Sequence, residues 1–223
     1  MTTKPLQRGD RAQHVVNQIR EAIITGALAP GSALRQEELA ANYASSRMPI
    51  REALRTLSAE GLVQLIPNRG AIVAPIDIEE LRENFEMREA AEVLAIRLAV
   101  PHLSNAQIDQ AASIQKQIDT APIQDFGPLN KAFHCTLYAP AGRPRLIAHI
   151  GSLHDIADRY LRFTLLHLDY IDRSSSEHEA ILDACYRRDI EVAMRLTSTH
   201  ILEAGRTLES YLREHLGTRL RSS

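Results

Sequence analysis

One hairpin pattern limits what this 223-residue chain can fold into. The apolar, β-branched runs "LVQLI" and "AIVA" stand on either side of "PNRG", and they predict two strands joined by a tight turn. After Pro75 no further alternating pattern appears, and the apolar residues recur at helical spacing instead. The chain is therefore expected to be mainly α, with its small sheet confined to one place.

Three helices are predicted before the hairpin. Apolar residues at helical spacing place them at 12–28, 35–43 and 47–60, and the short stretch "ASS" separates the last two. The order is then helix, helix, turn, helix and a two-stranded wing. This is the order of a winged helix-turn-helix, which we place in residues 1–75.

A second domain is predicted at 78–223, as an antiparallel bundle of six helices. These helices are expected at 78–100, 105–119, 127–139, 144–168, 176–187 and 190–216, with stretches such as "PAGRP" and "DYIDRSSS" between them. Ser104 and the serines before Glu177 are expected to cap the helices that follow, because a serine hydroxyl accepts the free N–H groups of a first turn.

Charge divides along the same boundary. Residues 1–75 carry nine Lys and Arg against six Asp and Glu, whereas the remainder carries 17 against 22 and eight of the nine histidines. A basic module joined to an acidic, histidine-rich one suggests a polyanion partner for the first and a different task for the second.

The apolar runs also bear on where the protein works. Charged residues interrupt them too often for a membrane span, and the N-terminus has no apolar core that could serve as a secretory signal. Cys135 and Cys185 sit in helical patterns without metal-ligand spacing, so a pair of reduced thiols is the simplest interpretation. We expect a cytoplasmic protein.

A row of arginines follows one edge of the third predicted helix. The apolar stripe of this helix consists of Ile50, Ala53, Leu54 and Leu57. Arg47, Arg51 and Arg55 recur every four residues beside that stripe. A planar guanidinium can pair with guanine O6 and N7 or with phosphate oxygens, and it stays charged. Such a row is usually only a solvated face, but here the helix-turn-helix context favours a helix that enters the major groove.

The helix start and the wing tip suit the same task. If Ser46 is the N-cap, Pro49 lies in the first turn, where its missing N–H costs nothing, and the helix dipole faces an anion. At the tip of the wing, Arg69 is expected to reach the DNA backbone or the minor groove, and Gly70 would allow close approach.

The stretch from "IREAIITG" to "NRGAIV" resembles the winged helix-turn-helix of the GntR family of bacterial transcription regulators, and "SR-x-P-I-REAL-x-x-L-x-x-EGLV" is the pattern that carries the resemblance. It implies that Arg47 and Arg51 are the principal contacts to double-stranded operator DNA. The full predicted set of DNA contacts is Arg35, Ser46, Arg47, Met48, Arg51, Arg55, Arg69 and Gly70.

Two positions depart from the family pattern. Ala44-Ser45 stand where such proteins often have Gly-Val, and Gln36 stands where a glutamate is usual. Neither change removes a charge needed for DNA, but the turn before the third helix is expected to differ slightly.

Three histidine-containing motifs mark the second domain: "LNKAFHCTLY", "SSSEHEAIL" and "TSTHIL". Asn130 and His134 are four residues apart and share a helix face. His178 is expected in the first turn of its helix and His200 mid-way along the last, so both can point to a common centre. Neutral imidazoles that converge in a helical core can bind Zn²⁺ or Ni²⁺. A lone histidine is more often satisfied by ordinary hydrogen bonds, and we keep that interpretation for His102, His149, His154, His167 and His215.

From Ile78 onward the chain resembles the all-helical FCD ligand-binding domain of the FadR branch of GntR regulators, in its shorter VanR-like variant, through "FH-x-x-L" and "EH-x-A-I-L". The resemblance implies a divalent metal ion, Zn²⁺ or Ni²⁺, held by His134, His178 and His200 together with Asn130, which stands where aspartate is common. An amide offers a carbonyl oxygen but no negative charge, so metal affinity should be weaker or the ligand's own carboxylate should complete the site.

The same resemblance implies a small organic acid bound beside the metal, with an arginine opposite. Arg88 matches that position, and Arg159 or Arg162 could also face inward, since an arginine can fork onto a carboxylate. The alternative for Arg88 is an ordinary ion pair with Glu92, its i+4 neighbour.

Two other classes of protein were weighed. A di-iron bundle requires glutamate three residues before a histidine, which no histidine here has, and a mononuclear hydrolase would need Glu177 or Glu179 as its base. A sensor without DNA binding is disfavoured by the intact arginine row. We therefore expect not an enzyme but a homodimeric, ligand-responsive regulator that reads a palindromic operator, most commonly as a repressor in this family.

Overall fold

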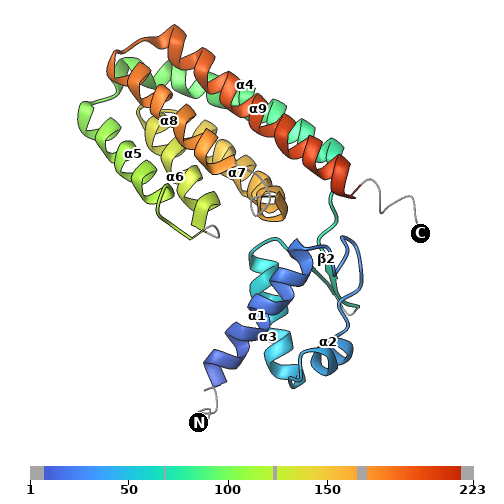
Figure 1. Cartoon of the computed structure of the whole chain (residues 1–223). Helices are drawn as coiled ribbons and strands as arrows, with labels where there is room; N and C mark the ends of the chain where they lie inside the picture. The colour runs from blue at the N-terminus through green and yellow to red at the C-terminus, as the bar shows by residue number, and fades with distance from the viewer. Residues whose placement is uncertain (1–7, 68, 123–124, 165–169, 217–223) are drawn as a thin grey trace. The chain divides into compact units, whose positions relative to one another are not determined.

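The computed structural model describes residues 8–67, 69–122, 125–164 and 170–216. The chain divides into two units, Met1–Ile76 and Asp77–Ser223, and each is considered by itself below (Figure 1). Within the described residues the structure is helical apart from one two-stranded sheet. This confirms the mainly α fold predicted from the sequence.

The first unit consists of α1 (Arg8–Ile24), α2 (Gln36–Asn42), α3 (Arg47–Ala59), β1 (Val63–Ile66) and β2 (Gly70–Val73). The strands are antiparallel, and Val63 pairs with Val73 at the open end of the hairpin. The predicted stripe of α3 is buried against the rest of the unit, with Ile50 and Leu57 fully covered. The first helix begins at Arg8 and not at the predicted residue 12, and it ends at Ile24 and not at 28, because Gly26 takes a left-handed φ of 73°.

The turn between α2 and α3 keeps the backbone of a glycine turn without the glycine. Ala44 has a left-handed φ of 46°, and the N–H of Ser45 donates to the carbonyl of Ala40, as in a Schellman C-cap. A side chain at such a position costs about 1–2 kcal/mol. The departure noted in the sequence therefore changes the cost of the turn and leaves its hydrogen-bond pattern in place.

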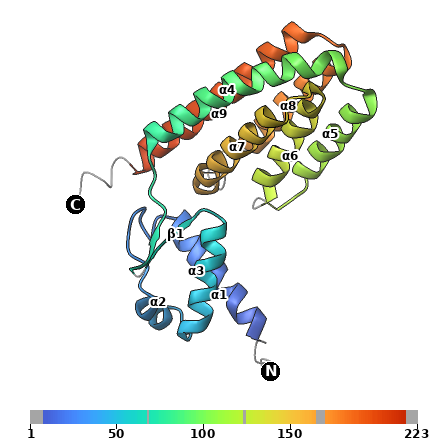
Figure 2. The same ribbon diagram turned by 180° about the vertical axis from the view of Figure 1, so that it is seen from behind.

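The second unit consists of six long helices: α4 (Ile78–Ala99), α5 (Asn105–Ile118), α6 (Phe126–Tyr138), α7 (Pro144–Thr164), α8 (Tyr170–Tyr186) and α9 (Ile190–Leu216). Short 3₁₀ turns, η1 (Val100–His102) and η3 (Ala139–Ala141), follow α4 and α6. In both views α4 and α9 lie side by side along their length (Figures 1 and 2). They approach closely at Gly205, where an added Cβ would lie 2.8 Å from Cγ of Phe85.

The start of α8 differs from the prediction. Ser104 does cap α5, with a reciprocal bond between its backbone and Gln107. The serines before Glu177 do not act as caps, because α8 already begins at Tyr170 and they lie inside it. His178 is accordingly in the third turn of its helix and not in the first.

Two further observations concern the chain as a whole. No helix among the described residues is both long and apolar enough to span a membrane. Cys135 and Cys185 are free thiols.

Candidate functional sites

Three histidines from three helices meet in the interior of the bundle. His134 comes from α6, His178 from α8 and His200 from α9, and all three are buried. Their metal-ligating atoms all lie within 4.8 Å of one another. The sequence prediction that these side chains share a centre agrees with this placement.

The outer nitrogens of two of these rings are held by acceptors. His178 Nδ1 lies 2.6 Å from Oε1 of Gln115, and His200 Nδ1 lies 2.6 Å from a carboxylate oxygen of Glu177. The amide nitrogen of Gln115 donates to Asp119 and Ser175, which turns its carbonyl oxygen towards His178. Since a carbonyl and a carboxylate can only accept, both rings carry their proton on Nδ1.

The third ring is held through a tyrosine. His134 Nδ1 lies 3.0 Å from the hydroxyl of Tyr138, and that hydroxyl donates its own proton to Glu92 at 2.9 Å. The hydroxyl oxygen therefore accepts from His134, whose proton is also on Nδ1. Burial lowers the pKa of His134 and of His178 well below the ordinary value, so both rings stay neutral.

Three Nε2 lone pairs are consequently left facing one another without a proton. Nε2 of His178 and Nε2 of His200 are 3.3 Å apart, and Nε2 of His134 is buried without a hydrogen-bond partner. Bare lone pairs at this distance repel, and a cation between them removes the repulsion. A tetrahedral ion with Zn–N bonds of about 2.0–2.1 Å would separate its ligand nitrogens by about 3.3–3.4 Å. The His178–His200 pair matches this separation and the third nitrogen lies within 4.8 Å of them, so this set of donors suits a metal.

Asn130 offers a fourth donor from α6, the helix that carries His134. It stands one turn before His134 on α6, is buried, and its Oδ1 has no hydrogen-bond partner. An amide oxygen in this condition costs free energy unless something coordinates it.

A buried charged group adjoins the histidines. Arg88 Nε donates to Glu92 at 2.8 Å, with only 3% and 0% of the two side chains exposed. His154 from α7 lies 3.2 Å from the same carboxylate oxygen and 3.3 Å from Nη2 of Arg88. Burial alone would raise the pKa of Glu92, but Arg88 and His154 hold the pKa well below its ordinary value. The ion pair weighed as the alternative for Arg88 is thus present, and it lies inside the site.

Arg159, also expected to face the effector, does not join this group. Arg159 bonds to Glu80 and to the hydroxyl of Tyr160, near the start of α4. The side chain of Arg162 lies outside the described part of the structure. Of the two described candidates, Arg88 is the one beside the histidines.

Several residues of the site were not singled out in the sequence. Gln115, Tyr138 and His154 all contact it, and Glu177 was considered only as a possible base. Tyr138 could have been found, because it stands four residues after His134 and shares its helix face. Gln115 and His154 carry no local signal. Glu177 lies behind the His200 ring and Glu179 is exposed, so neither takes the position of a hydrolytic base.

The DNA-contact residues predicted on α3 are exposed. Ser46 occupies the N-cap position with an extended backbone, and Pro49 lies in the first turn as expected. Arg47 is 69% exposed and Met48 is 59% exposed. Arg51 donates to the sulfur of Met48 at 2.8 Å, which lays both side chains along one edge of the helix.

Glutamates accompany these arginines. Arg47 lies 2.6 Å from Glu37 of α2, and Arg55 lies 3.4 Å from Glu52. The predicted contact Arg35 similarly pairs with Glu38 at 3.2 Å. At the wing, Arg69 and Gly70 are both exposed, and Gly70 has a φ of 98° that favours glycine.

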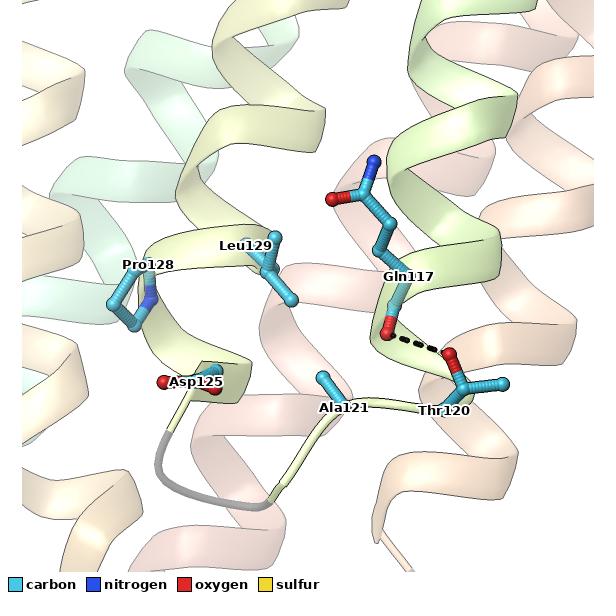
Figure 3. A pocket seen from close by; sticks show the side chains of 6 residues that line it. All are labelled: Gln117, Thr120, Ala121, Asp125, Pro128 and Leu129. Carbon is cyan, nitrogen blue, oxygen red and sulfur yellow. Dashed lines mark hydrogen bonds between the residues drawn. The ribbon is translucent and has the colours of Figure 1, made fainter.

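A surface hollow lies elsewhere in the bundle, between the end of α5 and the start of α6 (Figure 3). It has a volume of about 480 Å³ and is lined by Gln117, Thr120, Ala121, Asp125, Pro128 and Leu129. The hydroxyl of Thr120 donates a hydrogen bond to the backbone carbonyl of Gln117. None of the candidate metal ligands lines it, and we assign it no site.

Comparisons with known proteins agree on both units. Residues 11–73 match the model of the bacterial regulatory proteins of the gntR family, and residues 83–203 match the FCD domain. Together these matches cover the helix-turn-helix, the wing and all of the histidine site.

Individual relatives extend along most of the chain. The HTH-type transcriptional repressor RspR of Escherichia coli is 26% identical over 91% of both chains, and the repressor GlaR of the same species is 28% identical over 82% of this chain and 89% of its own. Among solved structures, a transcriptional regulator of Pseudomonas syringae is 29% identical, with a TM-score of 0.58 over 97% of this chain and 92% of its own.

Proposed function

Because the chain belongs to the GntR family of bacterial regulatory proteins and carries an FCD domain, it is a DNA-binding transcription regulator, and we propose that a divalent metal ion and a small carboxylate in its helical unit set its affinity for operator DNA. Its relatives in Escherichia coli are named repressors. We propose the same sense of regulation here, by a homodimer in the cytoplasm.

The observation that carries the metal proposal is the arrangement of the Nε2 atoms of His134, His178 and His200. Each ring carries its proton on the outer nitrogen and turns a bare Nε2 inwards. Metal-ligating histidines commonly show this division, in which the second nitrogen donates to a carboxylate, a carbonyl or a similar acceptor. Asn130 would complete the set as an oxygen donor.

The effector proposal depends on charge. Three imidazoles and an amide bring no negative charge to a doubly charged ion, and the buried Arg88 beside them has its own charge balanced by Glu92. When bound, the ion would supply positive charge for a carboxylate. Arg88 bonds through Nε to Glu92 and through Nη2 to His154, so its guanidinium is already held in place to receive the other end of a small acid.

The DNA proposal assigns the principal contacts to Arg47 and Arg51, with Arg69 at the wing. The exposure of Arg47 and Arg51 along one helix edge supports major-groove contact, and the exposed Arg69 at the wing tip would contact the backbone or minor groove. Two copies of this unit would read the two halves of a palindrome.

The test of the metal site is the double substitution His134→Ala with His178→Ala. The purified wild-type protein should carry up to one Zn²⁺ or Ni²⁺ per chain by elemental analysis, and the double variant should carry none. A matched control is His102→Ala with His149→Ala, which removes two exposed histidines of the same unit and should leave the metal content unchanged. Equal metal content in the wild type and the site variant would defeat the proposal.

A further inference from the structure

The candidate metal ligands are all neutral, which raises the question of what balances the charge of an ion among them. Transferring a divalent cation into a buried site is costly unless negative charge lies nearby. The position from which a carboxylate could coordinate directly holds Asn130 instead. Two carboxylates nevertheless lie behind the ligands: half-buried Glu177 is one hydrogen bond away, and buried Glu92 is two hydrogen bonds away.

The first of these carboxylates is Glu177. Its Oε2 lies 2.6 Å from Nδ1 of His200, and its side chain is 27% exposed. A carboxylate that accepts from the outer nitrogen fixes the ring orientation and makes the inner nitrogen a stronger donor to a metal. Arg173, at 3.6 Å from Glu177, offsets only part of this charge.

The second carboxylate is Glu92, which acts through Tyr138. The chain of bonds runs from Nδ1 of His134 to the Tyr138 hydroxyl and from that hydroxyl to Oε2 of Glu92. All three side chains are fully buried, so water cannot replace either bond without entering the core. The other oxygen of Glu92 is held by Arg88, which keeps the carboxylate in this orientation.

We infer that Glu177 and Glu92 are positioning residues of the metal site: Glu177 supplies from behind His200 negative charge that Asn130 does not provide, and Glu92, paired with Arg88, holds the Tyr138 hydroxyl that orients His134. The inference depends on the metal site proposed above. It assigns a role to Tyr138 as well, because without the phenol oxygen the Nδ1–H of His134 loses its acceptor and Nε2 becomes the better place for the proton.

Metal affinity tests the inference, with Zn²⁺ alone and Ni²⁺ alone as probes in competition with a chromophoric chelator. Glu177→Gln keeps an acceptor for His200 but removes its charge, and Tyr138→Phe removes the acceptor of His134. Each variant should bind the metal about 10–100-fold more weakly than the wild type. The matched controls are Glu179→Gln, an exposed glutamate on the same helix, and Tyr186→Phe, whose hydroxyl bonds to Asp109. Both controls should bind like the wild type.

The tautomer of His134 provides a second readout that a general loss of stability would not change. In ¹⁵N-histidine-labelled, metal-free protein, the ring of His134 should give the shifts of the Nδ1–H form, and Tyr138→Phe should move them towards the Nε2–H form. Glu177→Gln is nearly isosteric at a partly exposed site, so its folding is not in question. If both variants bind metal within about twofold of a metal-binding wild type, the inference is wrong; a wild type that binds no metal would instead overturn the proposed function.

Discussion

At the scale of single residues, repulsion within the histidine cluster destabilises the metal-free protein. A neutral imidazole with a bonded Nδ1 has one free lone pair, and the bundle turns three of these towards one another. A proton could relieve the repulsion, but burial opposes it at His134 and His178. The cluster should therefore respond to acid through the stability of the fold.

We predict that the metal-free protein loses stability as the pH falls from about 7 to 5. In the unfolded chain these histidines titrate near their ordinary pKa of about 6.5, whereas in the fold the pKa of His134 and of His178 lies well below it. Below about pH 6.5 the unfolded chain therefore binds protons that the fold does not. The free energy of unfolding should fall by up to about 1.4 kcal/mol per pH unit for each such histidine.

Urea unfolding, followed by circular dichroism at several pH values in the presence of a chelator, measures this slope. The double substitution His134→Gln with His178→Gln should flatten it between pH 7 and 5. An unchanged slope in that variant would show that other groups determine the acid response.

At the scale of elements, the packing of α4 against α9 depends on a residue without a side chain. In an ordinary helix Gly→Ala stabilises by about 1 kcal/mol. At Gly205 the added methyl group would lie 2.8 Å from Cγ and 2.9 Å from Cβ of Phe85, which are not free to move aside. We predict that Gly205→Ala lowers the free energy of unfolding by about 1–3 kcal/mol.

The control for this prediction is Gly151→Ala on α7. There the nearest atom is Cε of Lys131 at 3.3 Å, the far end of a flexible side chain. This substitution should be neutral or stabilising in the same thermal or urea unfolding experiment. A gain of stability at both positions would mean that α4 and α9 can separate without cost.

The recognition helix allows a second prediction at this scale. Arg51→Ala should weaken specific binding to an operator, first selected from random duplexes, by about 1–3 kcal/mol, because a two-pronged contact to guanine is lost. Fluorescence anisotropy at physiological salt measures the change, and bound metal should be unaffected. Arg97→Ala, an exposed arginine on α4, is the control. If the Arg51→Ala variant bound the operator with wild-type affinity, the assignment of α3 to the major groove would be wrong.

Helices with a regular apolar stripe were predictable from the sequence, whereas the start of α8 was not. The stripe of α3 gave its buried face directly. In α8 the run of serines predicts a helix start, but Tyr170, Ser174 and His178 recur every four residues on the buried face of a helix that begins earlier. Serine is only moderately unfavourable inside a helix, and tertiary packing of this stripe outweighs its preference for caps.

The residues of the candidate metal site were likewise only partly predictable from the sequence. Family resemblance picked out the three histidines and Arg88, which the structure brings together. It did not pick out Gln115 or the link from Tyr138 to Glu92, because these contacts join residues 63 and 46 positions apart. Such pairs are set by how the helices pack, and no periodicity in one segment reveals them.

At the scale of the whole molecule, a sensor unit and a DNA-binding unit share one chain and therefore one set of linked equilibria. If metal and carboxylate in the second unit change operator affinity by some factor, operator DNA must change the affinity of the second unit for them by the same factor. A coupling of about 5–150-fold is usual for such systems.

We predict this reciprocity for Zn²⁺ or Ni²⁺. Metal affinity measured with and without saturating operator should differ by the factor found when operator affinity is measured with and without metal. At an operator concentration that saturates the wild type but not the Arg51→Ala variant, that variant is expected to show a smaller effect of DNA on metal affinity. Unequal factors in the wild type would mean that a third equilibrium, such as dimer dissociation, enters one of the measurements.

The glutamates beside the arginines proposed to contact DNA have a consequence for the ionic-strength dependence of binding. A cationic side chain that meets a phosphate displaces condensed counterions from DNA, and each such displacement steepens the loss of affinity with salt. Arg47 and Arg55 begin this exchange paired with Glu37 and Glu52, which balance part of their charge. These two arginines should therefore add less to the affinity for random duplex. An operator whose bases accept hydrogen bonds from the guanidinium can instead compete with the carboxylate for each arginine. The protein should accordingly remain selective at low salt, where unpaired arginines would hold it on any DNA.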